Sequence, residues 1–333
     1  MILNKLRAFI FYKQARKFRR QGQYSSIALK LFLRAWLLSK NKNYLLGYIK
    51  YRRDLGRVIS FSLARKIIQA WPGFNQKERE LLFAFLLEGG FQGLTPPDSV
   101  FITKSSIPAV LASKDFEHIS RQQQFLVSIY SQQSLWRTEL TKLLQYHVQR
   151  QGICIVGNSG NMLNTNLGST IDAAGFIVRF NAFQSGKHFT TDLGQQCNLW
   201  CMTPSFKPNK LRTVDWLLVT GPEIQYRLAD WGAFYPFLEK QIPIVTVPLE
   251  VWRQLVTELQ APPSAGISVL AFFYWLLGSW AGISVAGFGA LSETQTTYHY
   301  MNPKNKPSER HNWVGEERII RRWLKEGLRS LHS

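Results

Sequence analysis

The chain has 333 residues, which is enough for a large core and favours two domains over one. It carries 41 basic and 21 acidic residues, a net charge of +20, so anionic partners are favoured over cationic ones. The three cysteines, an odd count without paired spacing, argue against a disulfide framework and fit a reducing cytosol. Cys197 and Cys201 have a conceivable metal spacing, but no His or Cys cluster accompanies them, and we interpret both as buried small side chains.

The first 70 residues are predicted to be helical and strongly basic. They contain 17 Lys or Arg residues and a single acid, Asp54. Apolar residues recur at helical spacing from Ala15 to Leu38, with Gly22 as a break. This segment resembles one tetratricopeptide-type helix pair, and a weaker pair follows from Tyr44 to Trp71. Because repeat arrays need about three units to bury a core, we expect a helical cap whose basic face is solvated or contacts an anionic membrane surface.

A joint is expected ahead of the second domain. Residues 72–117 hold one more helix and then the breakers Gly89-Gly90 and Pro96-Pro97. Helical spacing returns from Ile119 to Gln149, which we expect to form one long helix packed on a sheet. We place the domain boundary near residue 105, so that 1–105 is the basic helical region and 106–333 the second domain.

The second half of the chain alternates short apolar runs with helical or glycine-rich segments. This alternation predicts a parallel sheet with helices on both faces, an α/β fold. The apolar segment from Leu270 to Gly289 is divided by glycines, so a helix followed by a strand explains it better than a membrane span. The predicted strands are 153–156, 175–180, 197–201, 215–219, 242–247 and 282–287.

The stretch from Gly152 to Asn181 is predicted to form a strand, a turn, a helix and a second strand. Its turn reads Gly157-Asn158-Ser159-Gly160-Asn161, where two glycines permit backbone angles closed to other residues. In such units the crevice beyond the strand ends binds ligands, and a helix start offers free N–H groups to a phosphate. A dinucleotide fingerprint needs a third glycine and an acid after the second strand, where Arg179 and Asn181 stand, so a nicotinamide cofactor is disfavoured.

Three further segments indicate a related site. Pro263-Ser264-Ala265-Gly266 precedes a predicted helix, where a hydroxyl and free amides can hold a phosphate or ribose, or simply cap the helix. The strand after this helix ends at Gly287-Phe288-Gly289. A polar loop then brings Tyr298-His299-Tyr300 and His311-Asn312-Trp313-Val314-Gly315-Glu316. Histidine suits proton transfer near neutral pH, while Glu316 also suits the first turn of the next helix.

Together these segments resemble the four sialyl motifs of the sialyltransferases, glycosyltransferase family 29. The glycine–asparagine turn with Arg179-Phe180-Asn181 resembles the large motif, and Pro263–Gly266 with Gly287-Phe288 resembles the small motif. Tyr298-His299-Tyr300 is similar to the third motif, and His311 with Glu316 five residues later to the last. The resemblance covers about residues 150–325, and the order of the four motifs is more specific than any one of them.

The resemblance implies a Rossmann-like (GT-A variant) sheet and an inverting transferase that moves a sugar acid from a CMP-sugar to a hydroxyl of a glycan or glycolipid. It implies His311 as general base and His299 as a second catalytic histidine. No metal or other cofactor is expected, since the chain has no Asp-x-Asp pair and amides, His299 and Tyr300 would stabilise the leaving monophosphate. The donor-binding residues implied are Gly157, Asn158, Ser159, Gly160, Asn161, Asn181, Ser264, Ala265, Gly266, Gly287 and Tyr300.

The chain departs from the family pattern at four positions. Ile153 and Trp280 stand where animal members carry a disulfide, so that bridge cannot form. With no secretory signal or long apolar anchor at the start, we expect a cytoplasmic bacterial enzyme, peripheral on the inner membrane, that acts in capsule or lipopolysaccharide synthesis. Ala265 replaces a hydroxyl residue and Met301 an acid, which leaves the donor open between CMP-sialic acid and CMP-activated keto-deoxy-octulosonate (CMP-Kdo).

A different class of protein is the alternative: a basic adaptor or nucleic-acid binder with a degenerate Rossmann-like domain. It would bind DNA or RNA with a strong salt dependence and would not transfer a sugar. The basic residues are concentrated away from the glycine turn, and no recognisable nucleic-acid motif is present. Nucleic acid is therefore not expected as a partner.

Overall fold

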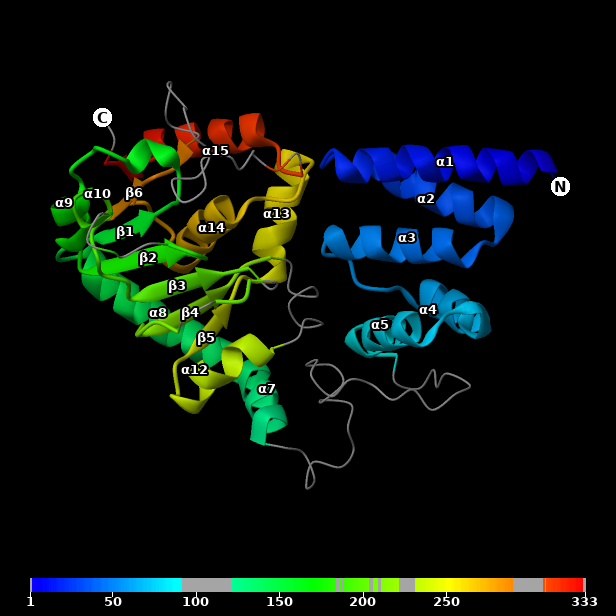
Figure 1. The fold of residues 1–333 in the computed structure, drawn as a ribbon, viewed down its shortest axis with the longest axis horizontal. Coiled ribbons are helices and arrows are strands. Elements are labelled where there is room, and N and C mark those ends of the chain that lie inside the picture. The colour runs from blue at the N-terminus through cyan, green and yellow to red at the C-terminus, as the bar shows by residue number, and fades with distance from the viewer. Residues whose placement is uncertain are drawn as a thin grey trace.

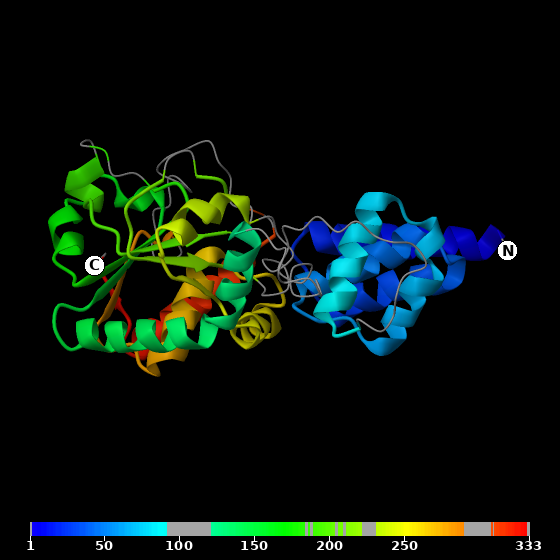
Figure 2. The same cartoon turned by 90° about the horizontal axis from the view of Figure 1, so that it is seen from below.

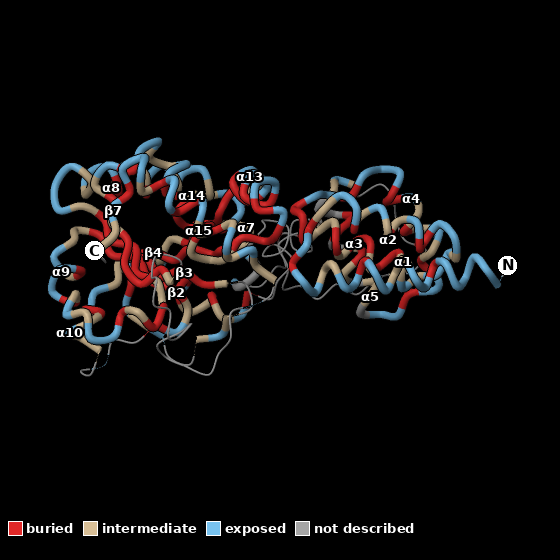
Figure 3. The backbone as a smooth tube through the Cα atoms, turned by 90° about the horizontal axis from the view of Figure 1, so that it is seen from above, coloured by how far each residue is buried: buried red, intermediate tan, exposed pale blue. Residues whose placement is uncertain are grey.

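The computed structural model describes residues 2–91, 121–183, 186, 189–203, 206–208, 211–221, 231–289, 308 and 310–331. In this part of the chain a helical region lies beside an α/β domain (Figure 1). The two lie end to end along the long axis, and the N-terminus is at the far tip of the helical region (Figure 2). Each has its own buried interior (Figure 3).

The helical region confirms the predicted helices and the break at Gly22, which has a φ of 67°. Several of its helices begin at a side-chain cap: Ser25 Oγ accepts from the N–H of Ala28, and Ser60 Oγ accepts from that of Leu63. The helices are α1 (Ile2–Arg20), α2 (Ser26–Ser39), α3 (Lys42–Asp54), α4 (Phe61–Gln69) and α5 (Gln76–Glu88), with a short 3₁₀ turn at Trp71–Gly73.

The interior of the helical region is aromatic and extends into the second domain. Tyr24 stacks on Tyr51 with ring centroids 5.0 Å apart. Trp252 and Val256, which belong to the α/β domain, are buried in the same apolar cluster. The helical region is therefore packed on its neighbour, as expected of a cap. Its likeness to tetratricopeptide pairs and the boundary near residue 105 stay predictions, since residues 92–120 lie outside the described part.

The α/β domain is built on one parallel sheet of seven strands in the order β5-β4-β3-β2-β1-β6-β7. Six strands confirm the predicted ones to within a few residues. The seventh, β7, has only two residues and carries no recognisable pattern. The strands are β1 (Ile153–Val156), β2 (Phe176–Phe180), β3 (Leu199–Met202), β4 (Trp216–Val219), β5 (Ile244–Thr246), β6 (Ile283–Ala286) and β7 (Arg329–Ser330).

Helices cover both faces of this sheet, which confirms the α/β, Rossmann-like class. Alternate residues of a strand face opposite sides: Ile153 and Ile155 enter the largest core, while Cys154 and Val156 enter a smaller one. The larger core includes α8 (Gln133–Val148), α13 (Leu249–Leu259), α14 (Ala265–Leu277) and α15 (Trp313–Lys325). Short helices α9 (Gly168–Asp172), α10 (Thr190–Leu193) and α12 (Tyr235–Glu239) contribute to the other cores.

The single long helix predicted from Ile119 to Gln149 is wrong. The structure has two helices, α7 (Arg121–Ser131) and α8, with Gln132 between them in a non-helical conformation. The side chain of Gln133 explains the break: its amide donates to Ile129 C=O at 2.9 Å and Ile244 C=O at 2.7 Å. Its Oε1 accepts from Thr246 N–H at 2.9 Å. The start of α8 is thus bonded to β5, a contact that helical periodicity cannot reveal.

The segment from Leu270 to Gly289 folds as predicted, as the end of α14 followed by β6. None of the helices in the described residues is long and apolar enough to cross a membrane.

Candidate active site

The site lies where the direction of the sheet order reverses. From β1 the chain proceeds through β2, β3, β4 and β5 on one side, and then returns to β6 on the other side of β1. The connections leaving β1 and β6 therefore turn in opposite directions. In open α/β sheets a crevice forms at such a point, beyond the carboxyl ends of the two strands.

Glycine is required at the ends of both strands. A Cβ built on Gly157 would lie 2.3 Å from the carbonyl oxygen of Gly287, and one on Gly287 would lie 2.6 Å from that of Gly157. Gly287 also has a φ of 70°, which other residues rarely adopt. Ser159 N–H donates to Gly287 C=O at 3.1 Å, which ties the predicted turn to β6. The large and small motifs thus meet through their backbones.

A pocket of about 170 Å³ opens at this point. Its walls bring the glycine–asparagine turn together with the start of α14 and the end of β6, both of which follow the turn by more than a hundred residues. Hydroxyl, amide and backbone groups supply its polar atoms, and aromatic rings supply its apolar wall. The lining residues are Gly157, Asn158, Ser159, Phe180, Ser264, Ala265, Gly266, Gly287, Phe288, Gly289 and Trp313.

The start of α14 supplies free hydrogen-bond donors to this pocket. Ser264 is the N-cap: its backbone is extended, and its Oγ accepts from Ile267 N–H at 3.5 Å. The next N–H groups, of Ala265 and Gly266, have no acceptor within the helix because of their position. A helix start of this kind favours a bound anion such as phosphate.

Glu316 holds Ser264 in place. Its carboxylate accepts from Ser264 N–H at 2.7 Å and from Ser264 Oγ at 2.6 Å. Glu316 lies in the first turn of α15 and is 2% exposed, so this bond crosses the core between two helices. The sequence suggested that Glu316 suits the first turn of a helix. Its bonds to Ser264 give it a second role.

Burial decides the charge state of this carboxyl group. Burial raises the pKa of Glu316 to about 7, although the two hydrogen bonds from Ser264 act in the opposite direction by favouring the carboxylate. Near neutral pH this group is therefore balanced between its neutral and its charged form.

His311 is oriented by the segment that leads to Ser264. Its Nδ1 lies 2.8 Å from the carbonyl oxygen of Pro262. Since a carbonyl only accepts, Nδ1 carries the proton, and Nε2 has a lone pair. Burial lowers the pKa of His311, with Arg310 acting in the same direction and the bond to Pro262 opposing. His311 is therefore neutral at pH 7, as a proton acceptor must be.

The imidazole of His311 does not line the 170 Å³ pocket but lies beside it. Its ring contacts the edge of Trp313, which does line the pocket, with centroids 5.3 Å apart. On its other side, His311 lines a second, larger cavity of about 580 Å³. The structure thus puts the candidate base between two cavities.

The remaining predicted asparagines have different surroundings. Asn158 lines the pocket and donates from Nδ2 to Phe180 C=O at 3.0 Å. Asn181 is not in the pocket lining: its Oδ1 accepts from Thr203 N–H at 3.1 Å. Asn161 follows Gly160 in a 3₁₀ turn, and its Oδ1 is buried with no partner among the described residues. The structure therefore brings Asn158 to the pocket and leaves Asn161 and Asn181 behind its wall.

Two predicted residues, His299 and Tyr300, lie outside the described part of the chain, as does Met301. Conversely, Phe180, Phe288 and Trp313 line the pocket although the sequence did not single them out as binding residues. Each of these three residues lies within a segment that resembles a sialyl motif. That position was the only feature of the sequence that could have indicated a binding role. Phe180 and Phe288 contact edge to face with centroids 6.4 Å apart, which makes one apolar wall.

Comparison with known proteins identifies the class. The family model described as "Glycosyltransferase family 29 (sialyltransferase)" matches residues 101–226, which contain the glycine–asparagine turn and Arg179-Phe180-Asn181. Over these residues the chain is similar to this family. The small motif and the two histidine motifs follow the matched segment in the family's order.

Two solved structures are similar in part. A mammalian sialyltransferase in complex with Gal-beta-1-3GalNAc-ortho-nitrophenol is 15% identical, with 60% of this chain and 85% of that chain covered at a TM-score of 0.42. A further crystal structure of a mammalian sialyltransferase is 16% identical, with 64% and 86% covered at a TM-score of 0.42. No curated protein matches the sequence.

The match supports a glycosyltransferase that uses a CMP-sugar donor and a glycan acceptor. All three cysteines are free, consistent with the missing disulfide positions. The described residues contain no group of three or more His, Cys, Asp or Glu side chains that could hold a metal ion.

The buried carboxyl of Glu316 predicts a specific pH dependence of stability. Its folded-state pKa is raised from 4.5 to about 7, so the folded protein binds more protons than the unfolded chain between these values, and stability falls as pH rises through this window. Glu316→Gln keeps the size and does not titrate. Urea unfolding measures the free energy of unfolding of both proteins. The value for the native protein minus the value for Glu316→Gln should fall by about 3 kcal/mol between pH 4.5 and 7.5.

The matched control is Glu317→Gln, since Glu317 is an exposed neighbour paired with Arg321 at 2.8 Å. The difference in unfolding free energy between Glu317→Gln and the native protein should change little over this pH range. A flat difference for Glu316→Gln would contradict the assignment of a buried titrating carboxyl.

Proposed function

We propose that the chain is an inverting transferase that moves a sugar acid from a CMP-sugar to a hydroxyl of a glycan, with His311 as general base. The donor is CMP-sialic acid or CMP-Kdo, both of which carry a carboxylate beside the reacting carbon. The proposed setting is the synthesis of a bacterial surface polysaccharide. The proposal rests on one observation: an anion-binding pocket and an oriented neutral histidine on adjacent segments.

The 170 Å³ pocket is the proposed site of the donor's nucleotide. The amides at the start of α14 and the hydroxyl group of Ser159 suit a phosphate. Gly157, Gly266 and Gly287 line the pocket without side chains. The rings of Phe288 and Trp313 suit a nucleoside base or ribose. Gly160, Asn161 and Asn181 support this turn and strand end from behind.

The reaction assigns one role to each group. The acceptor hydroxyl oxygen attacks the anomeric carbon as the bond to the CMP phosphate oxygen breaks, and that oxygen leaves with the electron pair. Nε2 of His311 takes the hydroxyl proton, and the bond from Nδ1 to Pro262 keeps the ring oriented. The amides of α14 stabilise the charge on the leaving phosphate, aided in the proposal by His299 and Tyr300.

No metal is needed for this chemistry. A CMP leaving group is a monophosphate and carries less charge than a diphosphate, so fixed donors suffice to stabilise it. The chain also lacks the Asp-x-Asp pair that would clamp a divalent ion on a diphosphate. We therefore propose metal-independent transfer.

The first helix supports a proposed contact with the inner membrane surface. Along α1 the side chains of Ile2, Leu3 and Leu6 are 83%, 59% and 55% exposed. Basic residues alternate with these apolar ones, Lys5 and Arg7 among them. Exposed apolar residues beside positive charge are typical of helices that lie on anionic membranes.

The donor assignment predicts selective stabilisation by cytidine nucleotides. CMP and CDP should raise the melting temperature, whereas UMP, AMP and NAD should not, and EDTA should change nothing. At 100 times its dissociation constant a ligand of the folded state adds about 2.7 kcal/mol, which a thermal shift detects. Ser264→Ala should weaken the CMP shift, because it removes the hydroxyl that caps α14 and connects its start to Glu316. A response to NAD, or none to CMP, would argue against the site.

The base assignment predicts that His311→Asn abolishes transfer and spares CMP binding. The Asn side-chain amide can still donate to Pro262 C=O but cannot take a proton, so transfer should fall about 10²- to 10⁴-fold. The assay is radiolabelled transfer from CMP-sialic acid and from CMP-Kdo. In the native protein kcat/KM should decline at acid pH below the ordinary histidine range, since the pKa of His311 is lowered. Full activity of His311→Asn would exclude His311 as the base.

The membrane assignment predicts binding to anionic vesicles. The protein should co-sediment with phosphatidylglycerol vesicles at low salt, and Leu3→Ser with Leu6→Ser should reduce the bound fraction. Neutral phosphatidylcholine vesicles are the control. Equal sedimentation with both lipids, or none with either, would contradict a charge-assisted contact.

A further inference from the structure

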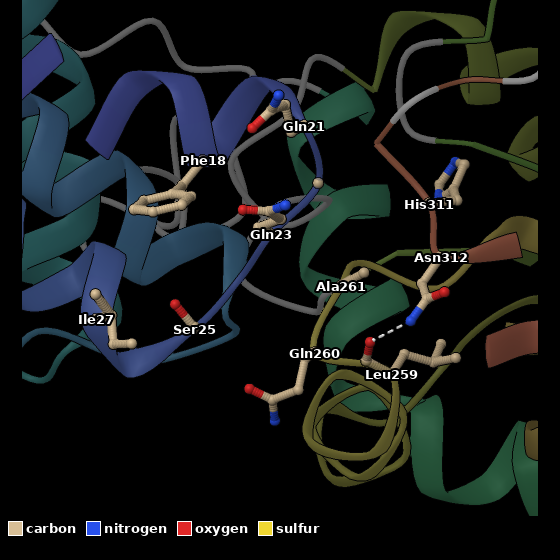
Figure 4. A pocket seen from close by; sticks show the side chains of 11 residues that line it. Phe18, Gln21, Gln23, Ser25, Ile27, Leu259, Gln260, Ala261, His311 and Asn312 are labelled. Atoms are coloured by element: carbon tan, nitrogen blue, oxygen red, sulfur yellow. Dashed lines mark hydrogen bonds between the residues drawn. The ribbon is translucent and has the colours of Figure 1, made fainter. Parts of the chain in front are cut away.

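The 580 Å³ cavity lies between the helical region and the glycosyltransferase domain (Figure 4). The turn between α1 and α2, which carries Gln21 and Gln23, forms one wall (Figure 4). The opposite wall consists of the end of α13 and the segment that carries His311 and Asn312. Its volume falls within the range of about 300–1,000 Å³ typical of small-molecule sites.

This cavity and the donor pocket share two chain segments. Residues 259–261 line the cavity, and residues 264–266 of the same segment line the donor pocket. In the same way His311 and Asn312 line the cavity, and the next residue, Trp313, lines the donor pocket. A molecule in the cavity therefore lies next to one in the pocket, with His311 between them.

The chemistry of the cavity suits a neutral, hydroxyl-rich ligand. Gln21 and Gln23 are exposed, and their side chains make no hydrogen bond to any residue that the structure describes. An amide both donates and accepts, which matches sugar hydroxyl groups. Phe18 supplies an apolar surface for the C–H face of a sugar ring. Among the lining residues that the structure describes there is no Lys, Arg, Asp or Glu side chain, which disfavours a second nucleotide.

The wall made by the helical region is held against the domain. Tyr24 N–H donates to Gln260 C=O at 2.8 Å across the interface. A Cβ on Gly22 would lie 2.1 Å from the carbonyl oxygen of Arg310, so the turn lies directly on the segment before His311. Arg253 also donates from Nε to Gly56 C=O at 2.8 Å. The backbone of the turn is thus held against the segment that carries His311.

We propose that this cavity is the acceptor site, and that the α1–α2 turn of the helical region selects the acceptor. The ligand is a neutral oligosaccharide whose terminal hydroxyl meets Nε2 of His311, while Gln21 and Gln23 bind the sugars behind it. The inference rests on the proposed function, in which His311 is the base. The helical region is then part of the active site as well as a cap.

The test is kinetic and uses the full-length chain. A panel of neutral di- and trisaccharides, with lactose and N-acetyllactosamine among them, is screened with labelled CMP-sialic acid and CMP-Kdo. Gln21→Ala combined with Gln23→Ala should raise KM for the best acceptor about tenfold. KM for the donor, hydrolysis of the donor without acceptor, and the CMP thermal shift should not change. Gln23→Trp, which fills the cavity, should abolish transfer with the same spared readouts.

The matched control is Gln14→Ala, since Gln14 is an exposed glutamine on α1 outside the cavity, and it should leave all values unchanged. An unchanged acceptor KM in the double variant would overturn the proposal. Transfer to no neutral oligosaccharide, with CMP still bound and donor still hydrolysed, would overturn it and leave the donor assignment intact. A failure to bind CMP would instead remove the proposed function, and this inference with it.

Discussion

Two strand ends, at Gly157 and Gly287, pass so close that neither position can carry a side chain. This contact shapes everything around the donor pocket. It lets β1 and β6 pair along their full length and still turn apart in opposite directions. Because the facing backbone occupies the space that a side chain would need, the pocket is lined at both positions by backbone groups. A parallel sheet creates the crevice, but the glycine pair determines its floor.

The walls of the pocket depend on a single buried carboxyl. Glu316 connects the first turn of α15 to the N-cap of α14, although these residues are 52 positions apart. Asn312, the N-cap of α15, accepts from Gly315 N–H and donates to Leu259 C=O at 2.9 Å. The start of α14 and the segment that carries His311 are therefore held together by one set of bonds. Burying an ionisable group is costly, and its raised pKa is a consequence of that cost.

The helical region is joined to the catalytic domain by more than surface contact. Asp54 is 1% exposed and accepts from Arg19 Nε and from the Tyr24 hydroxyl at 2.8 Å and 3.0 Å. Arg310, which immediately precedes His311, lies 3.9 Å from the same carboxylate. The only acid among the first 70 residues thus lies at the interface with the histidine segment. The excess of basic residues in this region did not indicate that Asp54 would lie at the interface.

The sequence by itself determined the elements and their class. Alternating apolar runs located the six main strands, because a strand buried on both faces must be apolar throughout. Gly22 and the serine caps ended and began helices for local reasons that need no tertiary contact. The four motifs, in order, indicated the resemblance to the sialyltransferases and selected most of the residues that line the 170 Å³ pocket.

Only the tertiary structure decided which of those residues meet. It separated Asn158, in the pocket, from Asn161 and Asn181, behind its wall, and divided the predicted helix at Gln132 through bonds to a strand more than a hundred residues away. It also buries Glu316, in the first turn of α15, against Ser264, and it places Gln21 and Gln23 on the wall opposite His311. These are contacts between segments far apart in the chain. Periodicity and spacing record only local geometry, so no pattern in the sequence could have contained them.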